Sequence, residues 1–307
     1  MNKIISILKD PKRILIAVLN RSAKLISDKL FLKLKFRLVM GEKLDLNNPK
    51  TFTQKLQWLK LYNRKPEYTT MVDKYAVKEY VANIIGKEHI IPTLGVWNSA
   101  NEIDWDALPN QFVLKTTHGG GGGGVVICKD KATFDRVATK EKLSKSLKSD
   151  IYWIFREWPY KNVTKQIIAE QYLSELSSTD LIDYKFFCFN GNVLYCQVIK
   201  DRSTLETIDF FDTNWEHQDF IGLLNNDVIK KSKQPISQPV NFSEMVSFAQ
   251  KLSKGIPFVR VDFYNLAGKI YFGELTFFPA SGLGKFEPKE WDVTLGNYLS
   301  LPAEKSL

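Results

Sequence analysis

Six consecutive glycines, Gly119 to Gly124, constrain the fold of this chain more than any other feature of its sequence. Glycine loses more backbone freedom on folding than any other residue, so a run of six costs far more entropy than an ordinary turn requires. A β-hairpin turn needs only one or two glycines. The run therefore predicts backbone that approaches a ligand closely or that moves.

The residues on either side of the glycines favour a strand–loop–strand flap. Lys115 lies near the end of a strand-like run before the glycines, and Val125, Val126 and Ile127 begin another strand after them. A Walker loop and a dinucleotide-binding loop must each open a helix, so the strand sequence disfavours both. Two interpretations remain: a flap whose amide groups bind polyphosphate beside Lys115, and a flexible polyglycine linker. The apolar flanks favour the flap, because linkers are polar on both sides.

Positive charge is concentrated at the start of a chain whose composition is otherwise ordinary. The 307 residues are 44% hydrophobic and 25% charged, which allows one large domain or two to three small ones. The net charge is +9, and residues 1–40 carry +8 of it, with ten Lys or Arg against two Asp. We therefore expect no nucleic-acid binding by the remaining residues.

The basic segment over residues 1–40 is predicted to be an amphipathic helical extension. Apolar residues recur in it at helical spacing between basic ones: Leu15, Leu19, Ile26, Leu30 and Leu34. This stripe either packs on the protein body, lies on an anionic membrane surface, or contacts another partner.

The sequence also bears on localisation. We find no apolar run long enough to span a bilayer and no signal peptide. Cys128, Cys188 and Cys196 lie in apolar runs without a CxxC motif, which predicts buried thiols in a reducing compartment. The expected location is the cytoplasm, at the inner face of the membrane if the extension binds lipid.

Helices and strands mix along the chain without strict alternation, which indicates an α+β fold. The periodicity predicts helices over 51–62, 71–85, 131–149 and 242–253, the last with Asn241 as its N-cap. Strands are predicted over 89–97, 166–173 and 183–202, with an Asn-Gly turn at 190–191, and a hairpin over 257–278.

The hairpin over 257–278 carries two carboxylates, Asp262 and Glu274, in apolar surroundings. A three-residue loop, 266–268, predicts that Asp262 faces Phe272 and that Arg260 faces Glu274. Both carboxylates and Arg260 then share one face of the strand pair, whereas a two-residue loop would separate the carboxylates. Such a pair suits one or two Mg²⁺ ions, which take oxygen ligands. The alternative is a solvent-facing pair neutralised by Arg260.

Several motifs in a fixed order resemble the TupA-type ATP-grasp family. They are DKYAVKEYV, LPNQFVLKTTHGGGG, IIAEQYL, DYKFFCFNG, PFVRVDFYN and YFGELTFFPASG, and the resemblance covers residues 45–300. It implies an ATP-grasp fold in three subdomains after the extension: an N-terminal α/β subdomain (41–108), a lid subdomain with the glycine flap (109–173), and a C-terminal mixed β-sheet subdomain (174–307).

The resemblance also implies roles for individual residues. The ATP phosphates would be contacted by Lys74, Lys115, Gly119, Gly120, Gly121 and Gly122. The backbone of Gln171, Tyr172 and Leu173 would read adenine, with Glu170 beside it. The Mg²⁺ ligands would be Asp262, Glu274 and Thr276, although many ATP-grasp enzymes have Asn at the last position, and a hydroxyl is a weaker ligand. The transferred phosphoryl group or the acid would be neutralised by Lys185, Arg202 and Arg260, which could equally be structural ion-pair partners.

The implied activity is ATP-dependent ligation of a carboxylate to an amine through an acyl phosphate. The family is associated with teichuronopeptide and capsular polysaccharide biosynthesis, so the expected product joins an amino acid or amine to a uronic-acid carboxylate. Two alternatives are a glycosyltransferase and a non-catalytic nucleotide-binding protein. A glycosyltransferase would not explain the lysines flanking a glycine flap, and no Asp-x-Asp motif stands at a predicted strand end.

Overall fold

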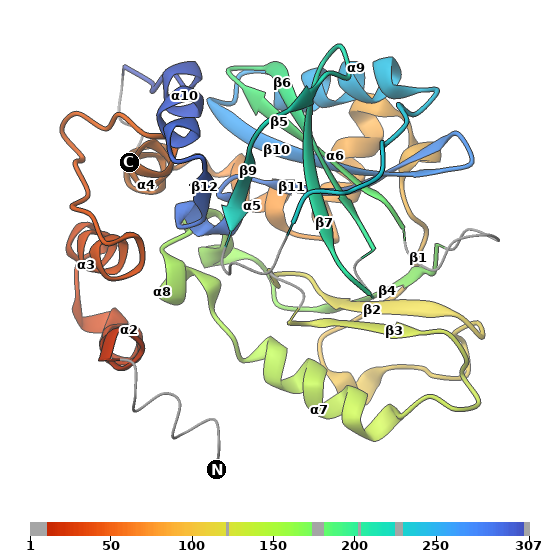
Figure 1. Ribbon diagram of the computed structural model, residues 1–307. Helices are drawn as coiled ribbons and strands as arrows, with labels where there is room; N and C mark the ends of the chain where they lie inside the picture. Colours follow the sequence, from red (N-terminus) through yellow and green to blue (C-terminus); the bar gives the residue numbers. More distant parts are fainter. Residues whose placement is uncertain (1–10, 121–122, 174–180, 202–203, 225–229, 304–307) are drawn as a thin grey trace.

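Two antiparallel sheets with helices around them form the body of the protein (Figure 1). The computed structural model describes residues 11–120, 123–173, 181–201, 204–224 and 230–303. The first sheet has four strands in the order β1-β4-β2-β3, and the second has six in the order β11-β10-β5-β6-β7-β8. A short pair, β12-β9, completes the strands described.

The described residues that precede the first strand form helices joined by loops. Their α-helices are α2 (Pro11–Arg21), α3 (Asp28–Met40), α4 (Phe52–Tyr62), α5 (Glu67–Val72) and α6 (Ala76–Ile85). The helix predicted over 51–62 is confirmed as α4, and the Thr51 side chain caps it by accepting from Gln54 N.

The single helix predicted over 71–85 is wrong, because Asp73 divides it into α5 and α6. Oδ1 of Asp73 accepts hydrogen bonds from Tyr75 N at 2.9 Å and from Ala76 N at 3.2 Å. A short acidic side chain that bonds the backbone in this way ends one helix and starts another. Lys74 therefore lies at a helix junction.

The four-stranded sheet carries the glycine run between two of its strands. Its strands are β1 (Thr93–Trp97), β2 (Phe112–Thr116), β3 (Val125–Cys128) and β4 (Ile167–Gln171). Helix α7 (Arg136–Leu147) packs on this sheet through Leu143, and α8 (Ile151–Phe155) follows it. Strands β2 and β3 pair antiparallel, as a flap requires. Strand β1 comes from the range 41–108 but pairs with β4, so this sheet draws on both predicted subdomains, whose limits remain a prediction.

The six-stranded sheet combines four consecutive strands with a separate hairpin. Its strands are β5 (Asp183–Phe189), β6 (Asn192–Lys200), β7 (Thr207–Asp212), β8 (His217–Gln218), β10 (Phe258–Leu266) and β11 (Lys269–Thr276). The predicted Asn-Gly turn is confirmed, with positive φ angles of 51° at Asn190 and 84° at Gly191. Helix α9 (Phe242–Ser253) covers one face of this sheet through contacts such as Phe186 with Phe242.

The N-cap position of α9 is Asn241, as predicted, but its side chain does not cap the helix. Its amide donates to Gly268 O at 2.9 Å and its Oδ1 accepts from Asn265 Nδ2 at 2.6 Å. The side chain therefore ties the start of α9 to the turn of the β10–β11 hairpin.

The β10–β11 hairpin has a shorter loop than predicted, but Asp262 and Glu274 share one face as predicted. Leu266 pairs with Lys269, so the loop has two residues, Ala267 and Gly268, both with positive φ. The predicted pairing of Asp262 with Phe272 is therefore wrong. A register shift beyond Asp262 leaves Gly273 as an extra residue on β11, and this bulge pairs Asp262 directly with Glu274. The bulge cancels the one-residue shift of the shorter loop and keeps both carboxylates on one face.

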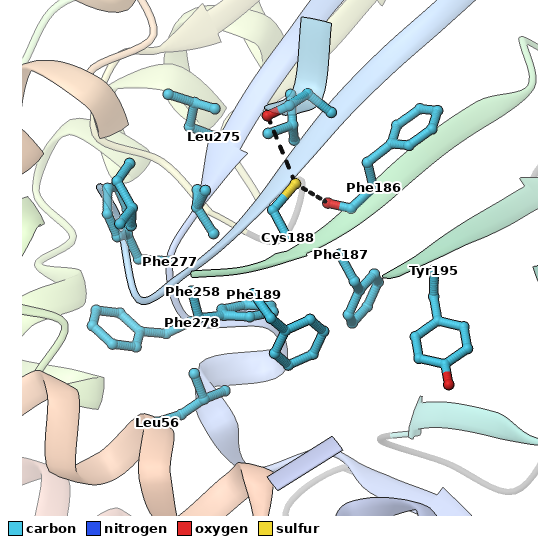
Figure 2. Packing of buried hydrophobic residues seen from close by; sticks show 14 of the residues in the cluster. Leu56, Phe186, Phe187, Cys188, Phe189, Tyr195, Phe258, Leu275, Phe277 and Phe278 are labelled. Carbon is cyan, nitrogen blue, oxygen red and sulfur yellow. Dashed lines mark hydrogen bonds between the residues drawn. The ribbon is translucent and has the colours of Figure 1, made fainter. Parts of the chain in front are cut away.

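Phenylalanine dominates the core beneath the six-stranded sheet (Figure 2). Phe258 packs edge-on against Phe52 of α4 at a centroid distance of 4.8 Å and against Phe189 at 5.1 Å. The thiol of Cys188 donates to Phe186 O and Ala249 O, and burial raises its pKa to about 12. All three cysteines are free and buried, which confirms the expected thiols.

Helix α10 (Glu290–Tyr298) fastens the end of the described chain to α4, with β9 (Ile221–Leu224) and β12 (Lys285–Glu287) beside it. Asp292 accepts from both Thr53 N at 2.9 Å and Thr53 Oγ1 at 2.6 Å. At Gly296 the two backbones come so close that an added Cβ would lie 2.2 Å from Lys50 O. Only glycine fits this contact.

We therefore expect Gly296→Ala to lower the free energy of unfolding by about 2 kcal/mol or more, because the clash is with backbone atoms that cannot rotate away. Val293→Ala is the control, since that side chain is exposed on the same helix. Urea unfolding measures both variants. Equal midpoints for the two would contradict the close packing of α10 on α4.

Candidate functional site

A row of polar side chains crosses four strands of the six-stranded sheet. Glu274 on β11 pairs with Asp262 on β10, Asp262 with Lys185 on β5, and Lys185 with Gln197 on β6. Residues in direct register share a face of a sheet. Phe186, which alternates with Lys185, packs on α9, so the row lies on the opposite face.

Asp262 is the centre of this row and is bound by two cations. Nε of Arg260 donates to its Oδ1 and Nη2 to its Oδ2, both at 2.7 Å, in a two-pronged contact. The Lys185 ammonium group also donates to Oδ2 and lies 3.3 Å from Asp183 Oδ1. Because all four side chains are buried, each charge depends on its partners for solvation.

Glu274 faces the same cations from the edge of the row, and its side chain is 39% exposed. Its Oε1 lies 3.3 Å from Arg260 Nη2 and accepts from Thr276 Oγ1 at 3.3 Å, while its Oε2 lies 3.7 Å from Lys74 Nζ. Burial alone would raise the pKa of Glu274, but the surrounding cations lower it to about 2. These cations are Lys74, Lys185, Arg260 and Lys115.

Three lysines from the helices and the four-stranded sheet meet this cluster across a narrow hollow. Oε1 of Glu170 lies 2.6 Å from Lys78 Nζ, and its Oε2 lies 2.5 Å from Lys115 Nζ. Burial alone would raise the pKa of Glu170, but Lys115 and Lys78 lower it. The hollow is lined by Lys74, Lys78, Ile90, Ile91, Lys115, Glu170, Phe272 and Gly273, so the two sheets meet there.

Lys78 belongs to this group, although the sequence analysis did not identify it. Its ammonium group also donates to Ile91 O at 2.7 Å, which fixes the side chain beneath Glu170. Lys78 stands four residues after Lys74 in the helix predicted over 71–85, and residues at this spacing in a helix share a face. That spacing was the available signal.

The ends of the glycine flap are held by a backbone hydrogen bond and by close contact with the Thr116 hydroxyl. Thr116 N donates to Gly124 O at 3.2 Å, and the hydroxyl of Thr116 hydrogen-bonds that of Ser146 on α7 at 2.9 Å. A Cβ added at Gly119 or Gly124 would lie 2.6 Å or 2.3 Å from Thr116 Oγ1. Of the predicted phosphate-binding glycines, Gly121 and Gly122 lie outside the described residues.

Lys74 is joined to the foot of the flap by two bonds. Its backbone N donates to Thr117 O at 3.0 Å, and its ammonium group donates to Gly119 O. The neighbouring His118 is buried, with Nε2 3.2 Å from Ser146 O. Burial, and then Lys165, lower its pKa, so we expect a neutral imidazole here. The helix junction at Asp73 thus brings Lys74 to the flap.

The segment predicted to read adenine ends β4. Gln171 is the last residue of the strand, and its N–H donates to Pro92 O at 3.0 Å. Tyr172 and Leu173 follow it, and Leu173 is buried. The adenine role of these residues remains a prediction, and so does the metal role of Thr276. Arg202 lies outside the described residues.

The chain makes a strained turn after β11. Ala280 and Ser281, in the turn Pro279–Gly282, have left-handed backbones with φ of 46° and 56°. Lys60, which is fully buried, donates to Ser281 O at 2.8 Å, and Ser281 Oγ donates to Glu157 Oε1 at 2.5 Å. Burial lowers the pKa of Lys60 to about 7 against the opposing effect of Glu157. A buried lysine–glutamate pair therefore supports the turn.

These observations define the class of protein: a glycine flap on one antiparallel sheet faces a carboxylate–cation cluster on another, which is the arrangement of an ATP-grasp fold. A family model described as TupA-like ATPgrasp matches residues 54–300. The chain belongs to the TupA-like ATP-grasp family.

Among the solved structures similar to this chain are three ligases or carboxylases of low identity. D-alanine–D-alanine ligase from Bacillus anthracis is 17% identical, with 69% of this chain and 58% of the ligase covered and a TM-score of 0.41. The Helicobacter pylori enzyme is 13% identical, with 84% and 68% covered and a TM-score of 0.46. Biotin carboxylase from Campylobacter jejuni is 14% identical, with 89% and 54% covered and a TM-score of 0.43. No curated protein matches the sequence significantly. The family assignment rests on the match over residues 54–300.

We expect Gly124→Ala to loosen the flap, because its new methyl group would displace the Thr116–Ser146 hydrogen bond. Gly123→Ala is the matched control, since nothing lies within 4 Å of a Cβ at that position. Amide hydrogen exchange in β2 and at the end of α7 measures the effect. Faster exchange is expected in Gly124→Ala only. Unchanged exchange in that variant would show that the Thr116–Ser146 hydrogen bond does not hold the end of the flap.

Glu170 should make the fold sensitive to acid. Its folded-state pKa is lowered, so its ion pairs stabilise the protein above the ordinary value of 4.5, and this contribution is lost as the pH falls through the folded-state pKa. Between about pH 6 and pH 3, the free energy of unfolding of the wild type should fall more steeply than that of Glu170→Gln. Urea titrations across this range provide the measurement, and parallel slopes would count against the ion pairs.

Proposed function

We propose that this protein is an ATP-dependent ligase that joins a carboxylate to an amine. The observation that carries the proposal is the convergence of two halves of one site. Lys115 and the flap approach from the first sheet, with Lys74 of the α5–α6 junction beside them, and Arg260, Asp262 and Glu274 approach from the second. Membership of the ATP-grasp family supports the same assignment.

The charges of the site fit a polyphosphate with a divalent cation. Five cations stand against four carboxylates: Lys74, Lys78, Lys115, Lys185 and Arg260 against Glu170, Asp183, Asp262 and Glu274. Every cation there is paired with a carboxylate, so binding ATP requires an exchange of partners. The lysines and Arg260 would turn to phosphate, and carboxylates would be released to hold Mg²⁺.

The donor chemistry at this edge of the sheet suits Mg²⁺, which prefers carboxylate and other oxygen ligands. Within the described residues, no group of three or more His, Cys, Asp and Glu side chains forms a metal cluster. The ion would therefore be held by Asp262 and Glu274, with Thr276, and by the phosphates themselves. When bound, it would neutralise phosphate charge.

The chain's own residues would act by binding, neutralising charge and excluding water. The substrate carboxylate attacks the γ-phosphorus of ATP, the bond to ADP breaks, and an acyl phosphate results. The amine then attacks the acyl carbon, loses a proton, and phosphate leaves. Lys185 and Arg260, which pair with Asp262 and Glu274, would supply positive charge to the transferred phosphoryl group, and Arg202 is proposed for the same task. Closure of the flap would keep water from the acyl phosphate.

We extend the proposal to the substrates and to the nucleotide base. The acid would be a uronic acid and the amine an amino acid or related amine, in the synthesis of a surface or capsular polysaccharide. The support for this part is the family resemblance. Gln171, Tyr172 and Leu173 would hold adenine at the end of β4.

The ligase assignment predicts that ADP and phosphate are released only when both an acid and an amine are present. The protein should be incubated with Mg-ATP and pooled uronic acids and amino acids, and omission of either pool should abolish ADP release. Turnover of a UDP-sugar without ADP release would instead indicate a glycosyltransferase.

Lys115→Ala should weaken ATP binding by at least about tenfold, since it removes a cation from the phosphate side of the site. Lys129→Ala is the matched control, because it removes an exposed lysine just beyond the same flap. Titration calorimetry with a non-hydrolysable ATP analogue gives both affinities. Equal affinities of the two variants for the analogue would show that Lys115 does not bind the ATP phosphates.

A further inference from the structure

Helices α2 and α3 carry apolar side chains on two opposed sides. One set packs inward, but Leu19 alone of the predicted stripe of residues 1–40 is buried in it. Leu19, Phe31, Leu32 and Phe36 are all buried. Leu15, Leu30 and Leu34, which belong to the same predicted stripe, are not. The two helices lie at an edge of the molecule (Figure 1).

The outer side of these helices is unusually apolar for an exposed surface. Of the fourteen large apolar side chains that are exposed within the described residues, six lie between positions 14 and 34. They are Ile14, Leu15, Val18, Leu25, Leu30 and Leu34, and Leu25 is 89% exposed. Single exposed apolar residues are normal on a protein surface, but such a concentration marks an interaction site.

Positive charge surrounds these apolar residues. Seven basic residues of the two helices and their connection are exposed: Lys12, Arg13, Arg21, Lys24, Lys29, Lys33 and Arg37. Lys29, Lys33 and Arg37 recur every four residues and run beside Leu30 and Leu34 on α3.

The acidic residue of this described segment, Asp28, does not offset that charge. It is paired inward with Arg64 at 2.6 Å and with Arg156 at 2.8 Å, and it accepts from the Tyr152 hydroxyl. The exposed surface of the two helices therefore carries positive charge and apolar groups together.

We propose that the outer side of α2 and α3 docks on a membrane whose surface carries anionic lipids. The exposed leucines would enter the boundary between headgroups and acyl chains, and the basic side chains would attract the anionic headgroups. Among the described helices, none has the length and apolar character needed to cross a bilayer. A second copy of the chain fits this surface less well, because the two basic faces would repel each other.

The docking surface is joined to the body by buried contacts. Lys35 donates to Asn20 Oδ1 at 3.0 Å and to Ile154 O. Arg156 donates to Ala23 O and, at 3.1 Å, to Ile26 O. Both cations connect these helices to α8. Glu157, which follows α8, binds Ser281 in the turn at Pro279–Gly282. Docking would therefore hold the candidate site at a fixed distance from the lipid surface.

The test is flotation of the full chain with two kinds of vesicle, one of phosphatidylcholine alone and one of phosphatidylcholine with phosphatidylglycerol. We expect binding to the anionic vesicles and a loss of binding at high salt. Lys29→Glu/Lys33→Glu should weaken binding at least about 25-fold, since each basic residue near an anionic surface contributes about fivefold. Leu30→Ser/Leu34→Ser should also weaken it.

Two matched control variants distinguish docking by this surface from a general effect of net charge or surface hydrophobicity. Lys251→Glu/Lys254→Glu changes two exposed lysines on and just after α9, and Val137→Ser/Val240→Ser changes two exposed apolar residues elsewhere. Both should bind vesicles as the wild type does, and thermal unfolding should show that all four variants are folded.

Three results would overturn the proposal. The first is that the folded wild type does not bind anionic vesicles. The second is that either α3 double variant binds as well as its control. The third is a dimer in sedimentation that Leu30→Ser/Leu34→Ser dissociates without any vesicle binding, because this would assign the surface to a second copy. Each result is independent of ligase activity.

Discussion

The site depends on one buried carboxylate, Asp262, held between Arg260 and Lys185. A buried cation without an anion would be strongly destabilising, so Asp262 allows two of them to stand inside the six-stranded sheet. Arg260 in turn reaches Glu274 and Thr276 on the next strand. The cluster thus links three strands and faces the lysines of the other sheet.

Local sequence signals predicted the parts of this structure that local chemistry determines. The glycine flap, the Asn-Gly turn and α4 follow from residues close together in the chain. In the β10–β11 hairpin, local reasoning predicted the shared face of the two carboxylates but not the loop. An alanine takes a left-handed position in the turn, and Gly273, a lone glycine within a strand, forms a bulge. The two departures offset each other, so Asp262 and Glu274 share a face for a different reason from the predicted one.

The contacts that sequence patterns did not reveal join distant segments. The ion pair of Glu170 with Lys78 connects β4 to a helix much earlier in the chain. Lys60 and Glu157 both bind Ser281, which connects α4 to the segment after α8. A charged residue on a helix is normally expected to face solvent, so no local pattern distinguishes Lys60 from its neighbours. Only the packing of α4 beneath the strained turn shows why its ammonium group is buried.

Glu170 pairs with Lys115 and Lys78, two lysines that we propose turn to phosphate, and this changes what nucleotide affinity would report. The fixed carboxylate of Glu170 neutralises Lys115 and Lys78, so few salt ions would be released from these lysines when phosphate binds. ATP affinity should then depend less on ionic strength than the number of lysines suggests. Binding would be a competition between two anions, one of which is part of the protein.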